Sequence, residues 1–339
     1  MYPVNQGSWG PTVRISHLCG ELSRLVDLDL VAGYRGERRM GLARYTIGGR
    51  LRGLDGIYVE SSTFLPAEAD VAFLALARAL GIPVLTYIRD AYQLFPDYYE
   101  LGSLRRRIGA FAFRPAMRAL RAVSSRLAFP SGGLARAVFG DEVDAVIIPP
   151  GSRAPVDVPR LATACRFLFV GNGQLEAQGA RRLIRAVEIA RERGADVELT
   201  IVSRPGEEPP GPHARWLRAV NGEGKAIDAL LPDVVATVIP RPRGAYNDLA
   251  VPVKLYDYLA YGRPMLVTDC IEQAAVVRRA DAGIVTGDAS EEMAEGMLTI
   301  ASANHAQLDQ WSDNANREAL ANSWGLRAAC ILETLEIAT

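Results

Sequence analysis

Residues 251–268, VPVKLYDYLAYGRPMLVT, contain three local signals that decide the fold class. The spacing of the apolar residues predicts an amphipathic helix over 253–261, which includes Lys254. Gly262-Arg263-Pro264 predicts a turn, and the apolar run 264–268 predicts a buried strand. A helix that leads directly into a buried strand is typical of a parallel sheet covered by helices.

The use of lysine singles out one position in this stretch. The chain has 38 lysines and arginines, and only Lys225 and Lys254 are lysines. A lysine ammonium is a compact point charge, whereas an arginine guanidinium is a planar fork. The lysine at position 254 therefore indicates that a compact ammonium is needed there.

Length and composition indicate a globular protein of about two domains. The chain has 339 residues, of which 49% are hydrophobic and 23% charged, enough apolar content for two cores. A formal net charge of -1 argues against a protein that coats nucleic acid. The four cysteines are scattered, without a CxxC pair, and are expected to be reduced thiols rather than disulfide or metal ligands. No signal peptide or apolar run of about 20 residues is apparent, so we expect a cytoplasmic protein.

Short apolar runs alternate with longer helical patterns along the whole chain. In the first half we expect strands at 26–31, 56–60, 83–89, 126–130 and 145–148, and helices near 14–24, 67–80, 104–123 and 133–139. In the second half we expect strands at 166–170, 197–203, 234–239, 264–268 and 283–285, and helices near 179–193, 213–220, 253–261, 272–279 and 291–301.

Two such series predict an α/β protein with two doubly wound, Rossmann-like domains that face a central cleft. The turn-rich segment 149–155, PPGSRAP, is the expected linker between them. The predicted domains are residues 1–154 and 155–322, with a terminal helix at 323–339 that packs back on the first domain. Ligands of open parallel sheets bind at the carboxyl ends of the strands, so we expect the site there.

The start of the chain is unusual for a doubly wound domain. Residues 1–6 are a poor first strand, short and interrupted by Pro3, yet a loop-like turn follows at Gly7-Ser8-Trp9-Gly10. We expect that the natural chain begins upstream, the alternative being a short stub of a strand.

Taken with its surroundings, segment 251–268 resembles the C-terminal domain of the retaining glycosyltransferases of family 4, which have the GT-B fold. The likeness extends to FLFVGNG at 167–173 with the helix after it, to ADAGIV at 280–285, and to Ser323-Trp324 before the last helix. In the first half, YIRD at 87–90 and FPS at 129–131 occur where family members carry related strings. Within the family, the likeness is to the branch that builds exopolysaccharide and O-antigen units.

The resemblance implies a site for a nucleotide-diphosphate sugar. A carboxylate at the position of Asp257 binds the ribose in this family, and Lys254 shares its helical face. The glycine loop Gly171-Asn172-Gly173 precedes a helix whose first amides can meet a phosphate. The alternative for Lys254 and Asp257 is a simple ion pair on a helix.

Two departures from the family pattern concern the same site. The family has an acid eight residues before the position of Asp257, where this chain has Leu249, and Asp248 is one residue away. A basic residue of the family is replaced by Gln178, so the pyrophosphate would be bound by Lys254, Arg204 or Arg241, or by backbone amides.

The acceptor side offers fewer signals. Asp90 and Glu60 end predicted strands, and either could orient an acceptor hydroxyl, the alternative being a loop cap or a pair with Arg89. The loop Gly7-Ser8-Trp9-Gly10 and His17 are expected on this side, and no metal site is expected.

Residues 101–140 contain eight arginines and no Asp or Glu. Apolar residues between them make parts of this stretch amphipathic, which suits an anionic membrane surface. The alternative is a solvated helix face. The residues expected to face the membrane are Arg105, Arg106, Arg107, Arg114 and Arg118.

The resemblance implies a glycosyltransferase that moves a sugar from a nucleotide-diphosphate sugar to a lipid-linked or glycan acceptor, with retention. It needs no cofactor beyond this donor substrate and no nucleic acid, and a cytoplasmic location, peripheral on the inner face of the cell membrane, is expected. One alternative is a non-catalytic relative that acts as a scaffold for a partner. Another is a nucleotide-sugar epimerase, which would need a cluster of acid and base groups that the sequence does not offer.

Overall fold

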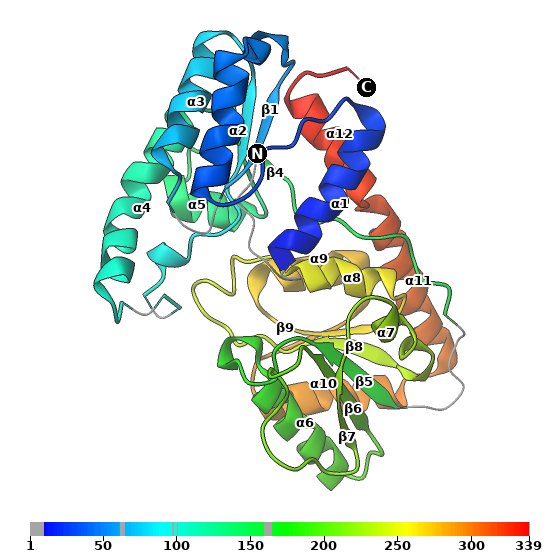
Figure 1. The fold of residues 1–339 in the computed structure, drawn as a ribbon. Helices are drawn as coiled ribbons and strands as arrows, with labels where there is room; N and C mark the ends of the chain where they lie inside the picture. Colours follow the sequence, from blue (N-terminus) through cyan, green and yellow to red (C-terminus); the bar gives the residue numbers. More distant parts are fainter. Residues whose placement is uncertain (1–9, 62–64, 97, 100, 159–164, 339) are drawn as a thin grey trace. The chain divides into compact units, whose positions relative to one another are not determined.

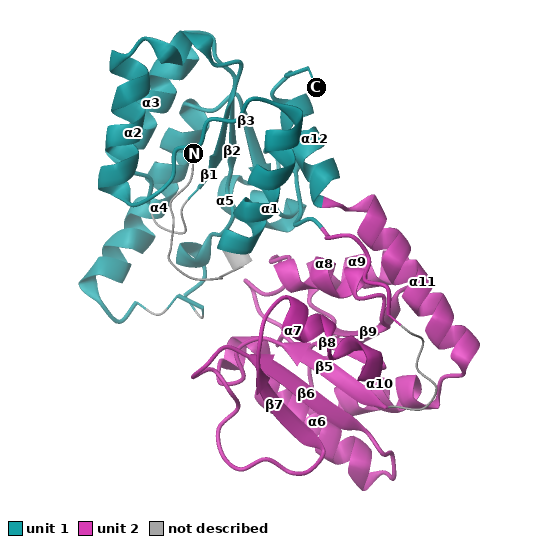
Figure 2. Cartoon of the chain, turned by 45° about the vertical axis from the view of Figure 1, so that its right-hand side comes forward, with its two compact units in different colours: residues 1–151, 324–339 teal, residues 152–323 magenta. Residues whose placement is uncertain are grey.

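The chain forms two compact units, each with its own parallel sheet. A computed structural model describes residues 10–61, 65–96, 98–99, 101–158 and 165–338. Unit 1 consists of Met1–Gly151 with Trp324–Thr339, and unit 2 of Ser152–Ser323 (Figure 2). From the sequence, the boundaries were expected after residues 154 and 322. Two α/β units with parallel sheets confirm the predicted fold class.

Unit 1 contains a four-stranded sheet in the order β1-β2-β3-β4. The strands are β1 (Ile57–Glu60), β2 (Val84–Tyr87), β3 (Arg126–Phe129) and β4 (Ala145–Ile147). All neighbours pair in parallel, with Ile57 opposite Val84 and Leu85 opposite Arg126. Every residue of β2 is buried, as expected for a strand inside a parallel sheet covered by helices.

Within the described residues, six α-helices belong to unit 1. They are α1 (Gly10–Leu25), α2 (Arg35–Ile47), α3 (Glu68–Ala79), α4 (Leu104–Ala122), α5 (Gly132–Phe139) and α12 (Trp324–Thr334) among the described residues (Figure 1). Side-chain caps begin two of them, since Ser103 accepts from Arg106 N and Ser131 from Leu134 N. The helix α12 packs on α1, although it is separated from it by the whole of unit 2 in the sequence.

Unit 2 contains a six-stranded parallel sheet in the order β10-β9-β8-β5-β6-β7. Its strands are β5 (Arg166–Val170), β6 (Glu198–Ser203), β7 (Leu217–Asn221), β8 (Ala236–Ile239), β9 (Met265–Thr268) and β10 (Gly283–Thr286). Its helices are α6 (Ala180–Glu192), α7 (Lys225–Asp228), α8 (Val253–Ala260), α9 (Ile271–Ala280), α10 (Ser290–Ser302) and α11 (His305–Ala321).

The two faces of this second sheet carry separate apolar cores. Phe167 and Phe169 belong to the core formed with α6 and α10, whereas Leu168, between them, belongs to the core formed with α8, α9 and α11. Alternate residues of a strand point to opposite faces, so β5 contributes to both layers. Figure 1 shows α6 and α10 on one side of the sheet and α8 and α9 on the other.

The structure corrects the predicted elements at several places. The expected strand at 26–31 is irregular, and α2 follows it, where no helix was predicted. Only Arg38 and Leu42 of α2 are buried, so its sequence shows little apolar periodicity. The expected helix at 213–220 is wrong, because Leu217–Asn221 forms the edge strand β7. The helix α11 was also not predicted.

A buried ion pair joins α2 to α3. The Arg38 guanidinium donates from Nη2 to Asp70 Oδ2 at 2.8 Å and from Nη1 to the carbonyl of Gly33 at 2.7 Å. Both charged side chains are less than a tenth exposed. Removing one partner of a buried pair leaves an uncompensated charge, which is strongly destabilising.

We expect Arg38→Ala to lower the free energy of unfolding by about 3 kcal/mol because Asp70 would stay buried without its partner. Arg39→Ala, at an exposed position of the same helix, is the control and should change it by less than about 0.5 kcal/mol. Urea unfolding followed by circular dichroism measures both. Equal midpoints for the two variants would contradict this role of the pair.

Candidate functional site

Lys254, on the first turn of α8, lies at the carboxyl end of β5. Its Nζ donates to the carbonyl of Val170 at 2.7 Å and to Gln178 Oε1 at 2.9 Å. The same Nζ lies 4.7 Å from the ring centroid of Phe169, a cation–π contact. All of these partners are neutral. The ammonium is therefore held in place by neutral groups, and the nearby carboxylates of Asp257 and Glu207 only partly offset the effect of burial on its pKa.

A second cation close to Lys254 has no acidic partner within the described residues. Arg241 follows β8, is only 9% exposed, and donates to the carbonyl of Ala250 and to Asn247 Oδ1. Burial lowers the pKa of Lys254 to about 7, and the positive charge of Arg241 acts in the same direction. Two buried or half-buried cations with neutral partners form a site that an anion would stabilise.

Asp257 lies one turn further along α8 and is half-buried. Burial raises the pKa of its carboxyl to about 6, against the opposing effect of the Arg153 charge. No hydrogen bond or ion pair of the Asp257 side chain is found within the described residues, since Arg153 itself pairs with Asp228. The alternative of an ion pair between Lys254 and Asp257 is therefore not what this part of the chain forms.

The backbone amides of the glycine loop after β5 already donate hydrogen bonds within the protein. Gly171 N donates to the carbonyl of Val202 at 2.9 Å, Asn172 N to Gln178 Oε1 at 3.2 Å, and Gly173 N to the carbonyl of Glu207 at 2.7 Å. These three amides are used within the protein. A phosphate at this loop would instead meet the first amides of α6, for which the N-cap Gly179 provides no side-chain acceptor.

The two glycines of this loop are needed for close approach. A Cβ on Gly171 would lie 2.2 Å from Gln178 Oε1 and 2.6 Å from Lys254 Nζ. A Cβ on Gly173 would lie 2.6 Å from Pro209. Gln178, where the family pattern has a basic residue, therefore has a role that the sequence did not reveal: it holds the Lys254 ammonium.

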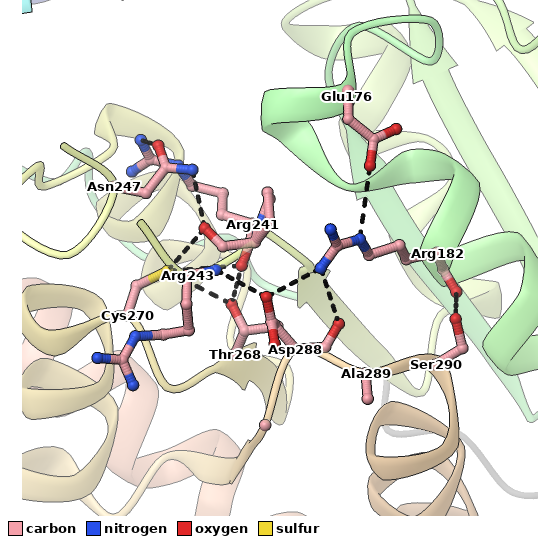
Figure 3. A network of polar contacts seen from close by, with 12 residues as sticks. Glu176, Arg182, Arg241, Arg243, Asn247, Thr268, Cys270, Asp288, Ala289 and Ser290 are labelled. Carbon is pink, nitrogen blue, oxygen red and sulfur yellow. Dashed lines mark hydrogen bonds and ion pairs between the residues drawn. The ribbon is translucent and has the colours of Figure 1, made fainter. Parts of the chain in front are cut away.

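Asp248 lies in an ion-pair network at the carboxyl ends of β8, β9 and β10. Its carboxylate accepts from Arg243 Nε at 2.7 Å and from Arg243 Nη2 at 3.0 Å, and Arg243 Nη1 also donates to Asp269. Figure 3 shows the backbone of Arg243 and the side chain of Arg182 converging on Asp288. Asp248 is therefore already paired, and Leu249 beside it is half-buried.

Arg204, the remaining residue expected to bind the donor, follows β6 and is half-buried. It lies in unit 2, as do Lys254 and Arg241.

In unit 1, Glu60 ends β1 and is buried with Arg14, a residue that sequence reasoning missed. Arg14 is 1% exposed, and its Nε donates to Glu60 Oε1 at 2.9 Å, as does the Tyr58 hydroxyl at 2.5 Å. Glu60 Oε2 is buried and has no hydrogen-bond partner in the part of the chain that the structure describes. An arginine among the apolar positions of α1 was the signal that could have indicated a buried acid facing it.

An apolar cavity of about 300 Å³ lies in unit 1, with Glu60 in its lining. Among its other lining residues are Leu18, Leu22, Leu28, Ile331 and Leu335. Glu60 is one of four acidic residues in a lining that is otherwise mainly apolar, the others being Asp27, Asp29 and Asp55.

The other residues predicted on the acceptor side have different surroundings. Asp90 pairs with Arg89 at 2.9 Å, the alternative that the sequence had left open. His17 is exposed on α1 and its ring stacks on Trp324, with ring centroids 5.4 Å apart. Gly10 is the first residue of α1, and residues 7–9 of the expected loop lie outside the described residues.

The five arginines predicted to face a membrane are exposed on α4. No helix in the described part of the chain has the length and the apolar character needed to cross a membrane. Among the residues that the structure describes, no group of three or more His, Cys, Asp or Glu side chains is placed to hold a metal ion.

Comparison with known families identifies the second half of the chain. Residues 164–303, which include Lys254, Asp257 and the glycine loop, match the family model described as glycosyl transferases group 1. These residues form a glycosyltransferase group 1 domain. The predicted enzyme class, a glycosyltransferase, is thereby confirmed. None of the curated proteins compared with the chain matches it.

Solved structures similar to this chain support the fold over nearly its whole length. Sucrose-phosphate synthase from Thermosynechococcus elongatus is 11% identical, with a TM-score of 0.63 over 99% of this chain and 97% of that one. A glycosyltransferase from Rickettsia africae is 12% identical, with a TM-score of 0.62 and the same coverage. A UDP-forming α,α-trehalose-phosphate synthase from Burkholderia xenovorans, in complex with glucose-6-phosphate, is 13% identical, with a TM-score of 0.59 over 88% and 76%.

We expect Gly171→Ala to lower the free energy of unfolding by about 1–3 kcal/mol, because the new methyl group would displace Lys254 or Gln178. Gly244→Ala is the matched control, since it lies in another loop of unit 2 and a Cβ there would meet nothing within 4 Å. Thermal unfolding of both variants checks the prediction. If Gly171→Ala melted with the wild type, the tight contact at Lys254 would be refuted.

Proposed function

We propose that the protein transfers a sugar from a nucleotide-diphosphate sugar to a lipid-linked or glycan acceptor, with retention of configuration. The observation that carries the proposal is the positive charge of Lys254 and Arg241, whose hydrogen bonds within the described residues all go to neutral groups. A diphosphate would supply the missing negative charge. The glycosyltransferase group 1 domain contains both cations and agrees with this chemistry.

In this proposal Lys254 and Arg241 stabilise the leaving nucleoside diphosphate. The charge on the diphosphate increases as the bond to the sugar breaks, so preorganised cations lower the barrier. Asp257, whose carboxylate has no partner within the described residues, accepts hydrogen bonds from the ribose hydroxyls. The donor sugar lies near Asp248, where a sugar hydroxyl would compete with Arg243 for the carboxylate.

In this proposal, transfer with retention needs no protein nucleophile. The acceptor oxygen forms a bond with the anomeric carbon on the face from which the diphosphate leaves. The bond from that carbon to the phosphate oxygen breaks, and the acceptor proton passes to the leaving phosphate. A trehalose-6-phosphate synthase with a TM-score of 0.61 and 9% identity was solved in a study of glycosyl transfer with retention, which favours the same outcome here.

Glu60 is the better supported of the two candidate carboxylates on the acceptor side. Both carboxylates are paired, Glu60 with Arg14 and Asp90 with Arg89, but Glu60 also lines the cavity of unit 1, and its Oε2 has no hydrogen-bond partner within the described residues. We propose that Glu60 orients the acceptor hydroxyl, while Arg14 and the Tyr58 hydroxyl hold its Oε1 in place.

A second candidate function is a non-catalytic relative that acts as a scaffold for a partner. It is favoured by Leu249, which cannot replace the acid of the family pattern. It is also favoured by the ion pair between Asp248 and Arg243, which occupies the neighbouring carboxylate. Nucleotide binding distinguishes the two, because a scaffold has no use for a diphosphate.

We expect a nucleoside diphosphate to raise the melting temperature by roughly 5 °C at about 100 times its dissociation constant. Lys254→Ala should abolish the shift because it removes the held ammonium. The control is Lys225→Ala, the other lysine, which is exposed on α7 and should leave the shift unchanged. If uridine, guanosine and thymidine diphosphates all left the wild-type melting temperature unchanged, the proposal would fail.

When a nucleoside diphosphate binds near pH 8, the protein should also take up a proton. The free protein has lost much of the Lys254 proton there, since its pKa is about 7, and a bound diphosphate restores the charge. Affinity should therefore fall as pH rises from 7 to 9, by up to about tenfold per unit. Calorimetry in buffers of different ionisation enthalpy measures the uptake.

Lys254→Arg is the control for this proton uptake, because arginine remains charged throughout this range. A variant that binds the diphosphate without proton uptake supports Lys254 as the group that titrates. Equal uptake in wild type and Lys254→Arg would assign it to another group.

A further inference from the structure

The outward face of α4 carries large apolar side chains. Leu104 is 73% exposed, Ile108 55% and Phe111 87%. Their spacing of four and three residues places them on one face of the helix. The opposite face carries Phe113 and Met117, which are buried in the core of unit 1.

The sequence alone did not distinguish the outward apolar residues of α4 from those that the structure buries. Both sets recur at helical spacing, so periodicity alone could not separate the core-facing set from the outward set. The structure leaves Leu104, Ile108 and Phe111 exposed next to one another. We call these three residues the apolar stripe of α4.

Positive charge surrounds the apolar stripe. Arg107, Arg114 and Arg118 are exposed on the same helix, and residues 101–140 contain no acid. Arg107 and Arg118 form no ion pair with any described residue, so their charges are uncompensated. Elsewhere in the structure many exposed arginines have an acidic partner, as Arg185 has in Glu188 and Arg279 in Glu318.

This combination favours a lipid surface over a protein partner. Neighbouring exposed apolar side chains mark an interaction site. An amphipathic helix with arginine beside Phe, Leu and Ile lies in the interface of an anionic bilayer, with its apolar face at the acyl boundary. The arginines then meet the lipid phosphates. The apolar stripe of α4 consists of only three residues, which suits shallow insertion.

We propose that α4 docks the protein on an anionic membrane, with the apolar stripe in the acyl boundary and Arg107, Arg114 and Arg118 at the headgroup phosphates. The inference rests on the proposed function in one respect, because it names the surface on which a lipid-linked acceptor is met. Figures 1 and 2 show α4 as a long helix at the outside of unit 1, away from α1 and α12.

Flotation with vesicles tests the docking. We expect the full chain to bind vesicles of phosphatidylcholine with phosphatidylglycerol at low salt, and not vesicles of phosphatidylcholine alone. Phe111→Ser should weaken binding roughly tenfold through lost apolar burial. Ile47→Ser is the matched control, since Ile47 lies on α2 in the same unit and is also 87% exposed. It should bind as the wild type does.

The charges are tested in the same assay. Arg107→Gln with Arg118→Gln should weaken binding by roughly fivefold per arginine. Arg39→Gln with Arg44→Gln removes two exposed arginines from α2 and should leave binding nearly unchanged.

Insertion is measured directly with Phe111→Trp. Its fluorescence should be quenched by brominated lipids in anionic vesicles, in excess of the quenching of the chain's own tryptophans. Ile47→Trp should show no such excess. Equal quenching of the two variants would overturn insertion of the apolar stripe.

Two further outcomes would overturn the proposal. One is a wild-type chain that does not float with anionic vesicles. The other is a wild-type chain that sediments as a dimer while the Phe111→Ser variant sediments as a monomer. This result would show that the apolar stripe contacts a second copy of the chain. The nucleoside diphosphate shift of Phe111→Ser should equal that of the wild type, so failure of docking can be told from failure of the donor site.

Discussion

The burial of one ammonium group governs the arrangement of the donor-side site. Lys254 enters a space between α8 and the carboxyl end of β5, where a charge is stable only if its hydrogens are bonded. The carbonyl of Val170 and the amide of Gln178 supply those bonds without supplying negative charge. Gly171 has no side chain because there is no room for one. The charge therefore remains available to an anionic ligand.

This arrangement gives a physical reason for an unusual residue. A basic residue at position 178 would place a second cation against Lys254, where each would raise the cost of burying the other. Gln178 accepts from Lys254 and from Asn172 N, so one amide oxygen fixes both the ammonium and the loop. The second positive charge comes instead from Arg241, which reaches the site from the end of β8 and is held by Asn247.

The carboxylates around the donor-side site differ in whether they form an ion pair with an arginine. Asp248 and Asp269 bind Arg243, and Asp228 binds Arg153. Asp257 is without such a partner within the described residues, and burial raises its pKa. The pairing of Asp248 and the raised pKa of Asp257 are consequences of the side chains that lie around them, and neither is visible in the spacing of the acids along the chain.

The sequence by itself determined the alternation of buried strands and helices, because strands covered on both faces are buried throughout and mainly apolar, as in β2 and β9. It also placed Lys254 and Asp257 on one helical face. It did not reveal α2, whose buried face contains an arginine, or the edge strand β7, whose short pattern also fits a helix. Only the tertiary structure decided that Gln178 binds a lysine 76 positions away, that Arg14 binds Glu60 across 46 positions, and which face of α4 is exposed. These contacts depend on how whole elements pack, and local spacing carries no record of that packing.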